Sequence, residues 1–266
     1  RRGETVLIDL FDSLTAPTAP HCMITGGTGA GKSVCMCDFI LQSLRQDPYI
    51  IVIDKGNSYQ RIGEYNNAPY LKFEGTPEVI LDPFAIGNRD DDHRAFLVSL
   101  LSTMITGGTE AINREEVSIL SEVVYKVISQ QEPSLNAIVS TLRSNEDSIS
   151  KSIARKFYPF YGNGQYARFF EGDKPVLNIK NKFTIFELGD VEAHKDLQAV
   201  IVSQLIHYVT EFVKTLPGVR KYLVIDEAWS LFKNDIAVQF LVKAVKTFRK
   251  YGVSVIFLTQ QIEDFA

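Results

Sequence analysis

Apolar residues along this chain gather in short runs, and longer stretches with helical spacing of apolar positions separate most of them. The run Tyr49–Asp54 (YIIVID) is continuously apolar and ends in an acid, as expected for a strand buried on both faces of a parallel sheet. Similar runs predict strands at 21–25, 183–188, 222–226 and 253–258, with two shorter candidates at 71–73 and 79–81. The pattern is typical of an α/β protein.

Helical spacing fills the segments between these strands. Helices are predicted at 32–45, 193–214 and 235–250, and strands that alternate with helices form a mainly parallel sheet. From about 90 to 170 the pattern is helical with little strand character, broken at Gly107-Gly108, at Pro133 and at 162–164. We expect a core made of residues 1–88 and 176–266, with a helical subdomain inserted at 89–175.

Length and composition agree with a globular chain. With 266 residues, 45% of them hydrophobic and 23% charged, the chain can bury one large core, or a core plus a smaller lobe. No apolar run approaches the roughly 18 residues of a membrane span. The chain opens with Arg1-Arg2-Gly3 and shows no signal-peptide pattern, which favours a piece of a longer cytoplasmic protein.

Charge and cysteine usage narrow the function classes. A net charge of -4 does not favour a broad basic face for nonspecific binding of nucleic acid, although a local basic ring in an oligomer stays open. Cys22, Cys35 and Cys37 fit neither a zinc site nor a disulfide framework, so we expect buried, reduced thiols.

The segment GGTGAGKS satisfies G-x-x-x-x-G-K-[ST] at every fixed position and lies between a predicted strand and a predicted helix. Glycines let the backbone curl around a phosphate, so that N–H groups and a helix N-terminus face its negative charge. We expect Lys32 to reach the β- and γ-phosphate oxygens of ATP and Ser33 to bind Mg²⁺. The predicted phosphate-binding residues are Gly26, Gly27, Thr28, Gly29, Ala30, Gly31, Lys32 and Ser33.

Two acids follow the predicted strand 222–226, whose segment YLVIDE has the form of a Walker B strand. Asp226 is expected to fix the shell of the magnesium ion. Glu227 is the candidate carboxylate that polarises the attacking water, which favours hydrolysis over switching. The alternative for Glu227 is an acid that begins the next helix, where the macrodipole suits it.

Polar residues near the last predicted strand add two candidates. Gln260, preferred over Gln261, follows strand 253–258 and could hydrogen-bond both the γ-phosphate and the water, or simply end the strand. Arg249 is predicted on the flank of helix 235–250, between the apolar stripe and the Lys-rich side. It could reach the γ-phosphate of a neighbouring subunit as an arginine finger, or be an ordinary surface residue.

These segments together resemble the ATPases of type IV secretion and conjugation systems, of the TraC/TraU kind, within the HerA/FtsK group of P-loop motors. The resemblance is carried by GGTGAGKS, by IDEAW with Asp226 and Glu227, and by FRK followed by a strand ending in TQQ. IDKGNSY and Asp82-Pro83-Phe84 are similar to two further family segments.

The resemblance implies a RecA-like P-loop NTPase core with an inserted all-α subdomain, and assembly into a hexamer. It also implies docking, through other secretion-system ATPases and channel components, at the cytoplasmic face of the bacterial inner membrane. For Asp54 and Lys55 it implies a place near the nucleotide or the subunit interface, whereas the residues alone equally suggest a strand-ending turn. The basic residues Lys151, Arg155 and Lys156 favour a solvated helix face over a partner contact.

The leading hypothesis is therefore an ATP-driven motor that powers assembly of, or transfer through, a secretion or conjugation channel. A DNA translocase of the HerA/FtsK sort is one alternative, which the acidic net charge does not favour. A docking scaffold gated by nucleotide binding is another.

Overall fold

The computed structural model describes residues 8–12, 14, 19–73, 75, 77–85, 89–107, 112–191, 193–227, 242 and 245–260. These residues contain one six-stranded sheet in the order β1-β6-β5-β2-β4-β3, and every pairing in it is parallel. The strands are β1 (Cys22–Thr25), β2 (Tyr49–Asp54), β3 (Tyr70–Lys72), β4 (Phe183–Glu187), β5 (Lys221–Ile225) and β6 (Val253–Thr259). All six carboxyl ends therefore meet at one edge of the sheet, as the α/β prediction requires.

Seven α-helices and four short 3₁₀ turns have bounds within the described residues. The α-helices are α1 (Lys32–Ser43), α2 (Gln60–Tyr65), α3 (Asp91–Thr106), α4 (Arg114–Ile128), α5 (Leu135–Ser144), α6 (Ser148–Lys156) and α7 (Lys195–Lys214). The 3₁₀ turns are η1 (Leu44–Gln46), η2 (Tyr158–Phe160), η3 (Ala167–Phe169) and η4 (Gly189–Val191). Residues 245–250 are helical before β6, whereas most of the predicted helix 235–250 lies outside the described residues.

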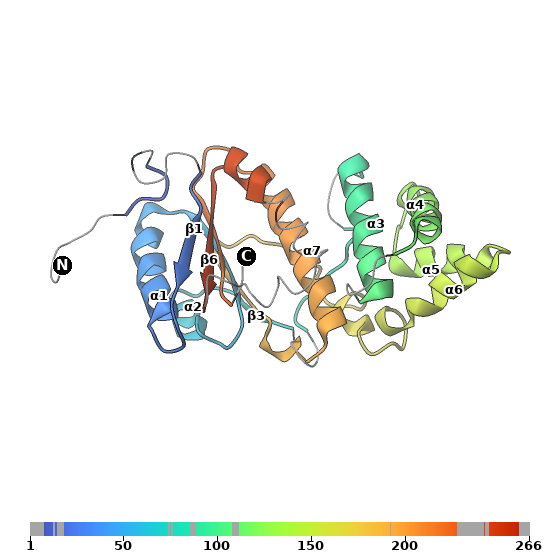
Figure 1. The fold of residues 1–266 in the computed structure, drawn as a ribbon, viewed down its shortest axis with the longest axis horizontal. Helices are drawn as coiled ribbons and strands as arrows, with labels where there is room; N and C mark the ends of the chain where they lie inside the picture. Colours follow the sequence, from blue (N-terminus) through green and yellow to red (C-terminus); the bar gives the residue numbers. More distant parts are fainter. Residues whose placement is uncertain are drawn as a thin grey trace.

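Both faces of the sheet are covered, because successive side chains of a strand point to opposite faces. In β2, Ile50 and Val52 pack with residues of α1 and α2 in one cluster, while Ile51 and Ile53 join a larger cluster on the other face. Figure 1 shows α1 and α2 on one side of the sheet and α7 on the other. This double burial explains why the central strands read as continuous apolar runs.

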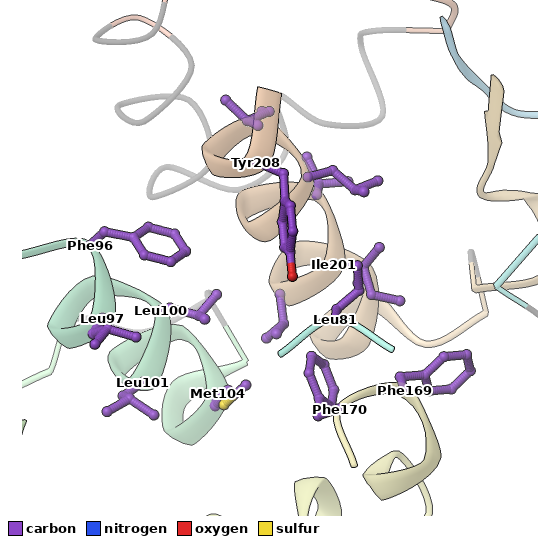
Figure 2. Packing of buried hydrophobic residues seen from close by; sticks show 14 of the residues in the cluster. Leu81, Phe96, Leu97, Leu100, Leu101, Met104, Phe169, Phe170, Ile201 and Tyr208 are labelled. Atoms are coloured by element: carbon purple, nitrogen blue, oxygen red, sulfur yellow. The ribbon is translucent and has the colours of Figure 1, made fainter. Parts of the chain in front are cut away.

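The helices α3 to α6 form a lobe that packs on the outer side of α7 (Figure 1). They lie where the sequence predicts the insertion, and the lobe and the sheet share one continuous hydrophobic cluster. Figure 2 shows the junction, where a stripe on α3 faces Ile201 and Tyr208 of α7. The labelled residues of that stripe are Phe96, Leu97, Leu100, Leu101 and Met104. Even α7, with its 20 residues, is not apolar enough to cross a membrane, and nor is any other described helix.

Each helix of the lobe begins with a side chain that caps its N-terminus. The capping oxygen accepts a hydrogen bond from the backbone N–H three residues on, which satisfies one donor that the helix itself leaves unpaired. The four caps are Asp90 to His93 in α3, Asn113 to Glu116 in α4, Ser134 to Ala137 in α5 and Asp147 to Ser150 in α6. Local sequence thus sets where these helices start.

Two sequence predictions are wrong. Residues 79–81 do not form a strand, because only Ile80 pairs, in an isolated bridge with Val176. The cysteines are free thiols but are not buried, since Cys35 is exposed and Cys22 and Cys37 are half-buried. Their exposure follows from the place of β1 at the edge of the sheet, which leaves this strand and the outer side of α1 without a further layer among the described residues.

Candidate nucleotide-binding site

The phosphate loop joins the end of β1 to the start of α1, as its motif predicts. Gly29 and Gly31 have φ of 77° and 88°, a left-handed conformation that side-chain-bearing residues rarely adopt. The backbone N–H of Gly26 donates to the carbonyl of Thr259 at 3.3 Å, which ties the loop to β6. The ammonium of Lys32 donates to the carbonyl of Gly26 at 2.6 Å and therefore lies across the loop.

Asp226 stands at the end of β5 and connects three parts of the site. The hydroxyl of Ser33 and the hydroxyl of Tyr59 both donate to its Oδ2, each at 3.0 Å. Its Oδ1 accepts from the backbone N–H of Glu227 at 2.8 Å. With 6% of its surface exposed, Asp226 is buried, and the structure brings it together with Ser33 as expected of two ligands of one cation.

Glu227 adopts a backbone conformation that is rare for its residue type. Its φ is 51°, in the left-handed region, so it does not begin a right-handed helix. The side-chain N–H of Gln260 donates to Oε1 of Glu227 at 3.2 Å, and the hydroxyl of Thr28 donates to the oxygen of Gln260 at 3.2 Å. Gln260 thereby links the phosphate loop to Glu227, whereas Gln261 lies outside the described residues.

Two further buried carboxylates end the neighbouring strands β2 and β4. Asp54 is 1% exposed and Glu187 is 2% exposed. Glu187 accepts hydrogen bonds from the backbone N–H groups of Gly56, Asn57 and Gly189 at 2.8 to 3.0 Å. Burial, together with the nearby charges of Glu187 and Asp226, raises the pKa of Asp54 to about 7. This acidic group is thus shared between protonated and ionised forms near neutral pH.

Lys55 follows Asp54 and approaches the acidic pair. Its Nζ lies 3.9 Å from Oε2 of Glu227. The loop also turns as the alternative prediction expected, because Asp54 Oδ1 accepts from the backbone N–H of Lys55 at 2.8 Å and Gly56 has φ of 115°. The strand-ending turn and the location beside the nucleotide loop are therefore both present.

Arg249 lies at the other edge of the sheet. It immediately precedes β6, whose carboxyl end carries Gln260, so the length of that strand, roughly 20 Å, separates the two. The predicted position between apolar and Lys-rich faces is also not met, because Arg249 is exposed while Phe248 beside it is buried. The structure does not bring Arg249 to the phosphate loop of its own chain.

The basic cluster of the sequence lies on α6, in the lobe remote from the sheet. Lys156 forms an ion pair with Glu116 at 2.7 Å, and Lys151 donates to the carbonyl of Glu146 at 3.2 Å. Lys151, Arg155 and Lys156 are exposed. They form a solvated helix face, apart from the nucleotide-binding candidates.

Sequence reasoning missed two residues that hold this site together, Tyr59 and Glu187. Glu187 had a usable signal, since it is an acid that closes an apolar strand, as do Asp54 and Asp226. Tyr59 had none, because an aromatic residue after a turn is compatible with ordinary core packing. Its fully buried ring and its hydroxyl contact with Asp226 become visible only in the folded chain.

The residues present fit a phosphate group and a hard cation. Side-chain space beside Gly27, Gly29 and Gly31 is open, so the loop leaves its backbone N–H groups approachable. Hydroxyl and carboxylate oxygens are ligands that Mg²⁺ prefers, and such sites commonly take the remaining ligands from phosphates and water. Consistent with this, the part of the chain that the structure describes holds no group of three or more His, Cys, Asp or Glu able to bind a metal.

Comparisons with known proteins agree with this geometry. The model of the TraG P-loop domain family matches residues 1–266. Protein TraC of Escherichia coli (strain K12) is 25% identical over 286 residues, covering 99% of this chain and 32% of TraC. The type IV secretion system protein virB4 of Bartonella henselae is 20% identical over 245 residues, covering 92% of this chain and 31% of that protein. The chain thus spans about a third of the length of these relatives.

Solved structures share the fold. The structure of VirB4 of Thermoanaerobacter pseudethanolicus superposes with a TM-score of 0.86 at 19% identity, covering 100% of this chain and 76% of that one. The plasmid coupling protein TrwB in complex with ADP and Mg²⁺ superposes with a TM-score of 0.59 at 17% identity, covering 92% and 64%.

The family match spans the whole chain, and the solved relatives have the same P-loop NTPase fold. These findings confirm the resemblance to type IV secretion and conjugation ATPases and the predicted P-loop ATPase class. The chain belongs to the TraG P-loop domain family.

Proposed function

We propose that this chain is the ATP-hydrolysing motor domain of a type IV secretion or conjugation system. The observation that carries the proposal is the convergence of Ser33, Asp226 and Glu227 beside the phosphate loop. Ser33 and Asp226 are 3.0 Å apart through their oxygens, and Gln260 links Glu227 to that loop. A cation ligand pair and a carboxylate at one edge of a sheet suit hydrolysis of a nucleoside triphosphate.

Each residue has a distinct task in the proposed reaction. The backbone of Gly26–Ser33 holds the phosphates, Lys32 neutralises the β- and γ-phosphate oxygens, and Ser33 and Asp226 hold Mg²⁺. When bound, the cation stabilises negative charge on the departing phosphate group. Glu227 accepts the proton of the attacking water, and Gln260 orients that carboxylate.

The cellular setting extends beyond this chain, so partners and assembly are proposed with it. We expect a hexamer in which Arg249 of one subunit completes the site of the next. We also expect docking onto other secretion-system ATPases and channel components at the cytoplasmic face of the inner membrane. The relatives' names support this setting, since they include a secretion system protein and a conjugal transfer protein.

Replacement of Glu227 tests the proposal. Glu227→Gln keeps the shape of the side chain but cannot take a proton, so we expect ATP binding close to wild type and turnover lower by about 10²- to 10⁴-fold. Binding is measured with a fluorescent ATP analogue and turnover by phosphate release.

Normal turnover in this variant would refute Glu227 as the base. Alternatively, partner binding that responds to ATP and survives Glu227→Gln, with negligible turnover in the wild type, would identify a nucleotide-gated scaffold instead of a motor.

A further inference from the structure

The loop after β2 lies directly beside the acidic pair after β5. The two strands are neighbours, with Ile53 paired to Ile225, so Lys55 and Glu227 each stand two residues beyond a paired position. The backbone N–H of Asp226 donates to the carbonyl of Ile53 at 2.9 Å, which continues the pairing beyond the strands. The proximity of Lys55 to Glu227 is therefore a consequence of sheet register, which the whole core maintains.

The carboxylate of Glu227 has a polar neighbour on each oxygen. Gln260 donates to Oε1 at 3.2 Å, and the ammonium of Lys55 lies 3.9 Å from Oε2. The side chains of Lys55 and Glu227 are 12% and 31% exposed, so water and salt screen this pair less than a surface pair. An ion pair of this kind adds little to stability, but it sets the direction of the carboxylate.

The loop that carries Lys55 is itself anchored at both ends. Asp54 accepts from the backbone N–H groups of Lys55 at 2.8 Å and Tyr59 at 3.3 Å. Glu187 accepts from Gly56 at 3.0 Å and from the next backbone N–H at 2.9 Å. The Lys55 side chain thus starts from a backbone fixed by two buried carboxylates, and its ammonium is placed with the accuracy that a positioning contact needs.

We infer that Lys55 is a positioning residue for ATP hydrolysis, which acts by holding the carboxylate of Glu227 towards the attacking water. The inference rests on the proposed function, in which Glu227 accepts the proton. An ammonium can hold a carboxylate through charge, so an apolar side chain of similar length loses the contact while a guanidinium retains it.

The test compares Lys55→Met with Lys55→Arg in the protein that hydrolyses ATP. We expect Lys55→Met to lower kcat about 10- to 100-fold, because a small misplacement of a catalytic group has effects of this size. The KM for ATP is expected to stay unchanged, and Lys55→Arg is expected to recover most of the lost kcat. Lys182→Met is the matched control, since Lys182 pairs with Asp47 near the opposite edge of the sheet and should leave turnover unchanged.

A double variant separates positioning from direct contact with the nucleotide. If Lys55 acts through Glu227, adding Lys55→Met to Glu227→Gln causes no further loss of turnover and no change in ATP affinity. Weaker binding of ATP in the double variant would overturn the inference, because it would mean that Lys55 contacts the phosphates itself. Wild-type kcat in Lys55→Met, with Glu227→Gln inactive, would also overturn it while leaving the proposed function intact. Normal turnover in Glu227→Gln alone would instead refute the proposed function.

Discussion

At the residue scale, the notable feature is three buried acids at the ends of neighbouring strands. Asp54, Glu187 and Asp226 are each at most 6% exposed. Carboxylates so close together and so poorly hydrated resist simultaneous ionisation, so a proton is retained to a higher pH than in water. The hydroxyl of Tyr59 lies among them as a donor, and burial together with Asp226 raises its pKa, which keeps it protonated.

This raised pKa of Asp54 predicts a particular dependence of stability on pH. Asp54 releases its proton near pH 4 when unfolded but at about 7 when folded, so between these values the folded state binds more protons. Its contribution to the free energy of unfolding therefore decreases as pH rises from about 4 to about 7. In Asp54→Asn this contribution is absent, and urea unfolding at pH 5 and pH 8 should show a smaller decrease than in the wild type. Parallel pH dependences in the two proteins would contradict the assignment to Asp54.

At the element scale, α7 is the connection between the sheet and the helical lobe. Its residues pack on the sheet on one side and against α3 on the other, within one continuous cluster (Figure 2). A core shared in this way transmits the loss of a contact to both parts, since close-packed interiors relax only partly around a cavity. The lobe and the sheet are therefore expected to unfold together.

Truncation of Leu100 tests this coupling. Leu100 is 1% exposed on α3, so Leu100→Ala is expected to lower the free energy of unfolding by roughly 2–5 kcal/mol. Hydrogen exchange should become faster in β5 as well as in α4. The same substitution at Leu41 of α1, which is 42% exposed, is the control and should cost less than about 1 kcal/mol. Faster exchange confined to α3–α6 would show that the lobe is an independent unit.

At the scale of the whole molecule, the position of Arg249 bears on assembly. The sheet separates Arg249 from the phosphate loop by the length of β6, so the residue can serve a nucleotide only in a neighbouring copy. An arginine contributed in this way makes turnover depend on association of subunits.

Mixing two inactive variants tests this arrangement. Arg249→Ala retains Glu227, and Glu227→Gln retains Arg249, so an interface between the two variants can contain one complete site. We expect each variant alone to lose turnover and their mixture to recover part of it, with wild-type turnover per subunit rising with protein concentration. No recovery in the mixture, despite demonstrated co-assembly, would exclude action of Arg249 in a neighbouring subunit.

The sequence by itself determined the central strands, most described helices and the composition of the phosphate loop. These features depend on local physics: continuous apolar runs suit doubly buried strands, capping side chains start helices, and positive φ demands glycine. The failures also have local causes. Residues 79–81 are apolar like a strand but have only the single bridge of Ile80 to Val176, and no run of letters reports the exposure of an edge strand.

Only the tertiary structure decided which of the chemically capable residues meet. The strand order places β2 next to β5, which brings Lys55 to Glu227 and Tyr59 to Asp226, although more than 160 positions separate each pair in the chain. The same order puts Arg249 at the far edge of the sheet. Sequence patterns record which face of an element is apolar, whereas proximity at the sheet edge depends on strand order and register, which long-range packing selects.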